Sequence, residues 1–451
     1  MVRVVGDSDP LVPGRCVAMR RGLAFWLMGG LLGILMVAAG APSPLYPVYQ
    51  QKWGFSAITL TAVFAVYAIA LLIAFLVAGR LSDHLGRKPM IIAALVVYAA
   101  ALACFAVADS VGWLYAGRVV QGVATGLATG AVSASLVDLA PPANPRLAPL
   151  VNSAAPTMGL AIGALGSSLL VTYAPDPMRL VYWILLGLIV AGLAGILLVA
   201  EPGERRPGAL ASLRPQVGVP GEAKRAFVAG LPALVAVWAL GGLYQALGPS
   251  LAASLLHSAN AVPGGAVIFL LTGVGAISTI ATRTSQPANV MRYGCLLLAV
   301  GALATVAAIA AGSAAGFFVA TAFAGVGFGL AFLGVFRSLT ALAPPTGRAG
   351  LITAIYIVSY LAFGVPVIIA GVAVGHVGLR TTAIAYGAVV AALAAVVAAE
   401  AARSARRGRP VMTVAGEVPL PPGPCCPPAI PRSAGRPVQD QESVVLPSGV
   451  D

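Results

Sequence analysis

Residues 79–89 read GRLSDHLGRKP and lie between two apolar stretches, residues 56–78 and 90–108. A membrane-spanning helix needs about 20 apolar residues, so each stretch is long enough to cross a bilayer. The charged segment between them would then lie at a membrane surface. These residues predict an integral membrane protein in which a short loop joins two spans.

The composition of the whole chain agrees with this interpretation. Of its 451 residues, 59% are hydrophobic and 9% are charged, whereas soluble domains carry roughly 25% charged residues. An ordinary soluble enzyme is therefore excluded, and five cysteines are too sparse for a disulfide-stapled secreted domain. Twelve spans are predicted, at residues 22–42, 56–78, 90–108, 113–137, 150–172, 179–200, 227–250, 262–281, 293–312, 315–338, 350–374 and 380–400.

The placement of lysine and arginine predicts the orientation of the spans. If both termini are cytoplasmic, 23 of the 27 basic residues fall on the cytoplasmic side, and Lys52, Arg179 and Arg380 fall on the other. The remaining one, Arg118, lies well inside a span, away from its ends. Basic loops facing the anionic inner leaflet of the cell membrane also explain the net charge of +13 without a nucleic-acid partner.

The first span is expected to remain in the protein rather than act as a cleaved signal peptide. It lacks a small-residue cleavage site, and the stretch PSPLYP follows it at residues 42–47. Residues 1–21 are predicted to form a cytoplasmic N-terminus. Met19 would serve equally well as a first residue, so the place of residues 1–18 is left open.

The spans divide into two sets of six that share an internal repeat. Residues 122–142 and 325–345 are identical at 12 of 21 positions, at an offset of 203. The repeat predicts an all-α membrane protein with two pseudo-symmetric six-helix bundles and a substrate site between them near the midplane. The predicted parts are the bundles at 22–200 and 227–401, a cytoplasmic linker at 201–226, and a disordered, proline- and arginine-rich tail at 402–451.

The loop at residues 79–89 resembles the signature loop of the major facilitator superfamily, G-x-L-x-D-x-x-G-R-K/R. It lies where that family places it, between the second and third spans. Residues 118–122 read RVVQG and resemble the family's second motif, R-x-x-Q-G. The resemblance covers roughly residues 20–401. It implies a monomeric secondary carrier of a small molecule that works by alternating access and uses no cofactor or metal.

The loop is predicted to hold a cluster of opposite charges. Asp138 closes the fourth span, where the helix dipole disfavours an anion, so a nearby cation is expected. Arg80 and Arg87 are the candidates, and the resemblance assigns this network to locking the cytoplasmic side. The alternative is that the charges fix topology alone. The predicted gating residues are Gly79, Arg80, Asp83, Gly86, Arg87, Lys88 and Asp138.

The second half is predicted to lack this network. The offset of 203 places Gln286 and Ala341 where the first half has Asp83 and Asp138. The gate should therefore be asymmetric, with the first half dominant.

Arg118 is the one charged residue that lies away from the ends of a predicted span. A buried arginine is costly and by default functional, and Gln121 shares its helix face at i+3. We expect Arg118 to line the cavity, where it binds substrate or influences a proton site; the alternative is that it reaches outward to the headgroups. No acid or histidine falls centrally in a span, which favours a neutral or anionic substrate and leaves Asp83, Asp138 or an outer-loop acid for any proton coupling.

Other residues in the spans are candidates for the cavity wall or for helix packing. Gln245 is favoured because an amide in lipid needs a partner, whereas a tyrosine in a span more often packs. Residues 163–168 read GALGSS where exporters of the superfamily often carry G-P-x-x-G-G, so an antiport role and simple close packing stay open. The candidates are Gly122, Asn152, Tyr244, Gln245, Tyr356 and Tyr360 for the cavity, and Pro156, Gly159 and Gly163 for the fifth span.

Three functions remain in view. The first is efflux of a lipophilic compound by a drug-efflux-like carrier, and the second is uptake or facilitated exchange of a nutrient or anion. The third is a membrane enzyme, which the sequence disfavours because its three histidines lie in loops or at their edges and no cysteine pair with metal-ligand spacing falls in a span. The chain also lacks the G-x-x-x-x-G-K-[ST] phosphate loop of an ATP-driven pump.

Overall fold

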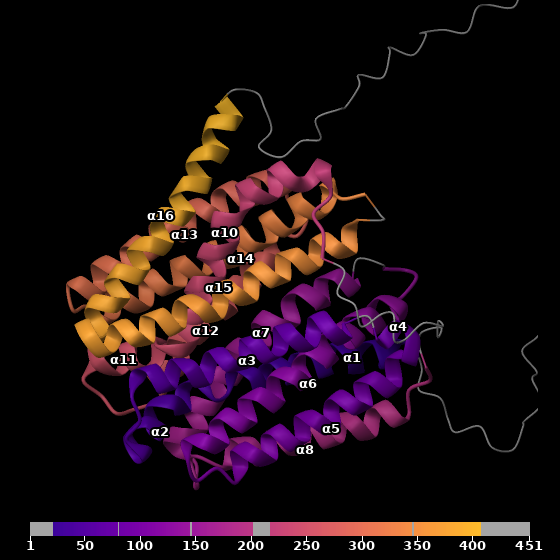
Figure 1. Cartoon of the computed structure of the whole chain (residues 1–451), viewed down its shortest axis with the longest axis horizontal. Helices are drawn as coiled ribbons and strands as arrows, with labels where there is room; N and C mark the ends of the chain where they lie inside the picture. The colour runs from indigo at the N-terminus through magenta and orange to yellow at the C-terminus, as the bar shows by residue number, and fades with distance from the viewer. Residues whose placement is uncertain (1–20, 80, 145–146, 202–216, 345–346, 407–451) are drawn as a thin grey trace, which may run out of the picture. The chain divides into compact units, whose positions relative to one another are not determined.

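The computed structural model describes residues 21–79, 81–144, 147–201, 217–344 and 347–406 (Figure 1). Within these ranges all regular elements are helices, and twelve are long and apolar enough to cross a membrane, as predicted. The helices are α1 (Arg21–Gly40), η1 (Ser43–Leu45), α2 (Tyr46–Trp53), α3 (Ala57–Ala78), α4 (Ser82–Leu85), α5 (Arg87–Ala106), α6 (Val111–Asp138), α7 (Leu147–Tyr173), α8 (Leu180–Leu197), α10 (Gly221–Ala246), α11 (Gly248–Leu256), α12 (Val262–Ala281), α13 (Pro287–Ala310), α14 (Ala314–Leu342), α15 (Arg348–Val377) and α16 (Leu379–Arg406).

The apolar runs become helices because a backbone in lipid must satisfy its own hydrogen bonds. Short polar signals set where several helices begin. The hydroxyl of Ser56 accepts the N–H of Thr59 at the start of α3, and the hydroxyl of Ser313 accepts the N–H of Gly316 at the start of α14. Each hydroxyl satisfies one of the donors that a helix start leaves without an intrahelical partner.

Three helix boundaries differ from the sequence-based expectation. Helix α10 begins at Gly221, inside the segment expected to be a linker, and α16 continues to Arg406, into the expected tail. Both extensions carry charged residues, so hydropathy alone misses helix that continues past the lipid. The first span ends at Gly40 and is followed by η1 and α2. Residues 1–20, 202–216 and 407–451, which include most of the predicted N-terminus, linker and tail, lie outside the described residues.

The two halves repeat the same glycine-mediated packing. In the first half, Gly122 and Gly126 of α6 press against the backbone of α3 at Tyr67 and Leu71. In the second half, the glycines at the repeat-equivalent positions 325 and 329 of α14 press against the backbone of α12. Added Cβ atoms would collide with main-chain oxygens at each site, so the helix pairs approach as closely as backbones allow. In Figure 1 the first half runs from indigo to magenta and the second from pink to yellow.

The halves meet mainly through α7 against α12 and α3 against α15. The side chains at these contacts are small or aromatic. Gly371 of α15 lies against Thr61 of α3, and the ring centres of Phe64 and Phe363 are 4.9 Å apart. Among the hydrogen bonds of the described residues, one joins the halves, from Thr172 Oγ1 to Asn260 Oδ1 at 3.2 Å. The halves are therefore held together by packing far more than by polar bonds.

Candidate functional site

Arg118 of α6 lies in the interior of the first half, where residues of α1, α2, α3 and α5 surround it. Its Nε donates to the Tyr46 hydroxyl at 2.7 Å, and its Nη1 donates to Gln121 Oε1 at 2.8 Å and to the Ala39 carbonyl at 3.2 Å. The guanidinium carbon also lies 5.3 Å from the ring centre of Tyr67, within cation–π range. Arg118 is 1% exposed and is the one charged side chain among the described residues that is fully buried. The alternative that it reaches the headgroups is therefore wrong, and the expectation that it lines the cavity is wrong as well, because first-half side chains cover it on all sides in this conformation.

The partners of Arg118 form a larger polar network. Gln121 Nε2 donates to the Ala38 carbonyl at 2.9 Å and to the Tyr98 hydroxyl at 3.1 Å. The Tyr98 hydroxyl in turn donates to the Leu35 carbonyl at 2.8 Å. The network thus ties α6 to α1 and α5. One buried donor, Arg118 Nη2, has no hydrogen-bond partner among the described residues.

The second half carries a neutral counterpart at the same position. The repeat offset of 203 places Thr321 where the first half has Arg118. The Thr321 hydroxyl lies 2.8 Å from that of Tyr244, whose ring stacks on Phe317. Tyr244 is therefore a packed core residue of the second half, and the buried charge belongs to the first half alone among the described residues.

An aromatic cluster in the second half faces α3 of the first. Trp238 of α10 is at its centre, with ring centres 5.3 Å from Phe332 and 6.1 Å from Tyr360. Tyr360 stacks on Tyr356 at 6.2 Å, as their spacing of one turn predicts, and Tyr356 contacts Phe75 of α3 at 5.3 Å. The cluster therefore brings the two predicted tyrosines to the boundary between the halves.

Several buried polar side-chain atoms have no partner among the described residues. Both amide atoms of Gln245 are in this state, as are Trp238 Nε1 and Asn152 Oδ1. Asn152 uses its other amide atom to donate to the Ser133 carbonyl at 3.2 Å, which links α7 to α6. Unpaired polar atoms are costly in such a site, so each one is available to a ligand or water.

The glycines of the fifth span pack against the first. Added Cβ atoms at Gly159 and Gly163 would meet the carbonyl oxygens of Gly33 and Val37 on α1. Pro156 lies inside α7, which continues through it to Tyr173. Close packing of α1 and α7 therefore accounts for both glycines.

The loop that begins at residue 79 forms an ion-pair cluster around Arg87. Arg87 Nη1 pairs with Asp83, and its Nε lies 3.2 Å from Asp138 Oδ2. A cation at the end of α6 is therefore present as expected, and Arg21 adds a bond from Nη2 to the Asp138 carbonyl at 2.7 Å. Gly86 has φ of +105°, a left-handed conformation that favours glycine at this turn. Arg80, the other predicted partner, lies outside the described residues.

Glu201 is a member of this loop cluster that the sequence did not indicate. Its Oε1 accepts the N–H of Arg87 at 2.7 Å, and its Oε2 accepts the N–H of Lys88 at 3.2 Å, so the carboxylate caps the start of α5. Lys88 Nζ donates to the carbonyls of Leu197 and Val199 at the end of α8. Each charge therefore sits at the helix end that its sign favours.

The corresponding loop of the second half holds no such cluster in the described part of the chain. Arg337 donates to the carbonyls of Arg283 and Ser285, and the two ion pairs between described residues both involve Arg87. This arrangement matches the expected asymmetry between the two loops.

Gly79, in the loop of the first half, contributes to helix packing, because its carbonyl oxygen lies 3.1 Å from where a Cβ of Gly130 would stand.

The helix count, the duplicated packing and the loop cluster agree with one family profile. The profile of the Major Facilitator Superfamily matches residues 28–365, about three quarters of the chain. The chain belongs to the Major Facilitator Superfamily. This membership makes it a membrane transporter and not an enzyme.

Two curated members of the superfamily resemble part of the chain. A stretch of 117 residues is 31% identical to the inner membrane transport protein YajR of Escherichia coli (strain K12), covering 26% of this chain and 25% of YajR. A stretch of 108 residues is 27% identical to the quinolone resistance protein NorA of Staphylococcus aureus, covering 24% and 28%. The chain thus matches about a quarter of the length of these relatives.

A solved structure of the superfamily resembles most of the chain. It is a bacterial homologue of the human lysosomal transporter Spinster in an inward-facing and occupied conformation, with a TM-score of 0.69 and 14% identity. The likeness covers 86% of this chain and 98% of that one. It shows that the two proteins share the fold of the superfamily.

Proposed function

We propose that this member of the superfamily exports a lipophilic compound, neutral or anionic, by alternating access between its two halves. The observation that carries the proposal is the aromatic cluster around Trp238 at the boundary between the halves. Rings that are packed edge to face present a large apolar surface with few polar atoms. Such a surface favours planar, apolar compounds over small hydrophilic ones.

The position of the charges supports a substrate without a strong positive charge. Arg118 is buried, and the acidic residues of the described helices lie within two turns of a helix end, as with Asp83 and Asp138. A cation in the middle of the bundle would meet no carboxylate from the described helices. The same argument favours a proton site, if one is used, at the Arg87 cluster or in an outer loop.

The orientation follows from the basic loops. We propose that both termini lie in the cytoplasm, because the basic loops face one side of the cell membrane. We propose that the carrier works as a monomer. The Arg87 cluster then lies at the cytoplasmic surface, where its opening and closing would accompany the switch of the carrier. Asp83→Asn should lower the turnover number with little change in ligand affinity, and an unchanged turnover number would count against gating.

Transport into inside-out vesicles tests the main proposal. Lipophilic neutral, anionic and cationic compounds would be screened with and without an imposed pH gradient. Export predicts accumulation of neutral or anionic compounds in these vesicles, absent from vesicles that lack the protein. Accumulation of cations alone would refute the proposed substrate class, and a requirement for the gradient would establish proton coupling.

Uptake or facilitated exchange of an anion is the second candidate function. Arg118 favours it, because a buried cation with an unpaired donor can bind an anionic group. Right-side-out vesicles distinguish the two directions. Faster entry of an organic anion into these vesicles than into inside-out vesicles would favour uptake over export.

A further inference from the structure

Prolines interrupt the first membrane span after Gly40. Residues 41–45 read APSPL and connect α1 to the short helix α2. Proline has no backbone N–H, so it cannot donate to the carbonyl four residues before it in a helix. Pro42 has φ of −70° and ψ of −20°, a helical conformation, so the bond that its nitrogen lacks is the one to the Ala38 carbonyl. The Ala39 carbonyl is also among the last four of α1, which have no intrahelical donor.

Two side chains of α6 supply the missing donors. Gln121 Nε2 donates to the Ala38 carbonyl at 2.9 Å, and Arg118 Nη1 donates to the Ala39 carbonyl at 3.2 Å. The C-terminal end of a helix carries a partial negative charge, which favours a cation. The end of α1 therefore accounts for a buried arginine that forms no ion pair with a described carboxylate.

The second half provides an internal comparison, because its equivalent helix is not interrupted at this point. The repeat offset of 203 places Gln245 where the first half has Pro42, and α10 remains helical through this position. Backbone N–H groups can therefore serve the carbonyls of this helix. The same offset places Thr321 and Ala324 at the positions of the two α6 donors. The arginine and the glutamine thus occur in the half whose helix is interrupted.

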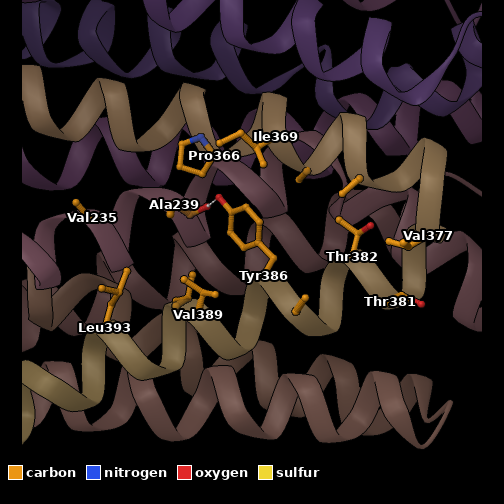
Figure 2. A pocket seen from close by; sticks show the side chains of 14 residues that line it. Val235, Ala239, Pro366, Ile369, Val377, Thr381, Thr382, Tyr386, Val389 and Leu393 are labelled. Carbon is orange, nitrogen blue, oxygen red and sulfur yellow. Dashed lines mark hydrogen bonds between the residues drawn. The ribbon is translucent and has the colours of Figure 1, made fainter.

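A side chain also donates to α10, but without a charge. The Tyr386 hydroxyl of α16 donates to the Ala239 carbonyl at 2.8 Å, as Figure 2 shows. Ala239 lies well before the last residue of α10, so its carbonyl also has a backbone donor within the helix. A neutral hydroxyl is therefore added to a continuous helix, whereas the guanidinium stands at a helix end.

Arg118 also holds the segment that follows the interruption. Its Nε donates at 2.7 Å to the hydroxyl of Tyr46, the first residue of α2. Beyond this bond, η1 lies against α12 and α2 lies against α11, so the segment contacts the second half. Figure 1 shows α2 and α11 at the end of the molecule opposite α4. One guanidinium thus connects the end of α1 to the start of a segment that meets the other half.

We infer that Arg118 and Gln121 form a cap on the interrupted span, and that this cap holds residues 41–53 where they close the outer side of the carrier. A helix that is broken by proline can bend at the break, and the cap fixes its angle. Both residues are therefore positioning residues that act on transport through α2. The inference rests on the proposed alternating access, but its tests read the position of α2 and need no substrate.

Distances between spin labels on α2 and α11 test the position of the segment. The full-length protein, with its five native cysteines replaced by alanine, would carry labels at Lys52→Cys and Ser254→Cys, which are exposed positions. In nanodiscs, we expect Arg118→Met to broaden the distance distribution by about 5 Å, the pitch of one helical turn. Tyr46→Phe, which loses the hydroxyl that accepts from Arg118, replaces Arg118→Met if that variant does not fold.

A reference pair within the second half controls for general loss of structure. Labels at Ser254→Cys and Ala315→Cys, both exposed, should give the same distribution with and without Arg118→Met. An unchanged distance between α2 and α11 in a folded variant would overturn the inference. Equal broadening of both pairs would also overturn it, because the effect would then not be specific to the segment.

Restoring the missing donor is the second test. Gln121→Met should speed hydrogen exchange at residues 37–41 by about tenfold, because the Ala38 carbonyl loses its donor. Pro42→Ala supplies an N–H to that carbonyl, so in its presence Gln121→Met should change exchange by less than about threefold. Pro44→Ala is the matched control, because its N–H lies two residues too far along the chain to rescue.

The outcomes separate this inference from the proposed transport. Equal acceleration by Gln121→Met with and without Pro42→Ala would refute the cap, as would an equal rescue by Pro44→Ala. Failure of every compound in the vesicle screen would refute export and leave the label distances and exchange rates as they are.

Discussion

Replacing Glu201 removes the carboxylate that caps the start of α5. Its two oxygens lie 2.7 and 3.2 Å from the backbone nitrogens of Arg87 and Lys88, which have no intrahelical acceptor in the first turn. Hydrogen bonds to a charged group are worth about 1.5–3 kcal/mol when buried. Because Glu201 is half-buried, we expect Glu201→Ala to cost about 2 kcal/mol of local stability, toward the low end of that range. Glu201→Gln, which keeps an acceptor oxygen and loses the charge, should cost about 1 kcal/mol.

Hydrogen exchange measures this loss directly. Amides in the first turn of α5 exchange by local opening, so their rates report the local free energy. A loss of 2 kcal/mol predicts roughly 30-fold faster exchange at residues 87 and 88 in the Ala variant, and 1 kcal/mol predicts about fivefold in the Gln variant. Mass spectrometry of peptides covering residues 86–92, from protein in detergent, resolves both changes.

The matched control is Glu222→Gln. Glu222 lies in the first turn of α10 and is exposed, so its replacement should leave exchange in α5 at the wild-type rate. Wild-type exchange at residues 87 and 88 in Glu201→Ala would refute the capping role. An equal acceleration in Glu222→Gln would show that the effect comes from net charge rather than from the cap.

The other predictions concern the interior of the bundle. Arg118→Lys keeps the positive charge but loses the planar guanidinium that bonds Tyr46, Gln121 and Ala39 together. We expect about 2–3 kcal/mol less stability in thermal unfolding and a large loss of transport in vesicles. Wild-type values in both assays would show that the network is not important. Gly163→Val should prevent accumulation of folded protein in membranes, because even a Cβ there overlaps the Val37 carbonyl, while Gly166→Val meets open space and should accumulate normally on fluorescence-detected chromatography. Trp238→Ala should weaken binding of a planar substrate by roughly 1 kcal/mol, about fivefold in Kd, and Trp238→Phe should restore most of it; equal Kd values in all three proteins would exclude stacking on this ring.

Features that depend on local spacing or on the solvent were predictable from the sequence. The twelve spans follow from the length of the apolar runs, because a single apolar segment in lipid can satisfy its backbone hydrogen bonds only by forming a helix. The Arg118–Gln121 bond follows from their i, i+3 spacing, and a cation beside Asp138, with Arg80 and Arg87 as the candidates, follows from the helix dipole. These inferences need no knowledge of which helices touch.

Features that depend on the register between helices were not predictable. Tyr46 and Tyr98 reach Arg118 and Gln121 from other helices, and Glu201 is 114 residues from the N–H of Arg87 that it caps. The role of Trp238 at the centre of the aromatic cluster was not predictable either. A single aromatic ring in an apolar span looks like ordinary packing when its neighbours are unknown. In lipid the pattern of apolar residues does not distinguish a buried face from an exposed one, so the partners of each face appear only in three dimensions.

The scarcity of polar bonds between the halves bears on how easily they can slip past one another. At the Phe64–Phe363 contact the faces are rings, and at Gly371 and Thr61 they are small groups. A sliding joint of this kind exchanges many dispersion contacts of about 0.1–0.2 kcal/mol each, and new ones form as old ones break. The energy barrier to sliding is then divided into many small steps. The Thr172–Asn260 hydrogen bond is the one polar bond between the halves among the described residues. Lipid viscosity and the ion pairs of the first half, rather than the joint itself, would set the pace of such a motion.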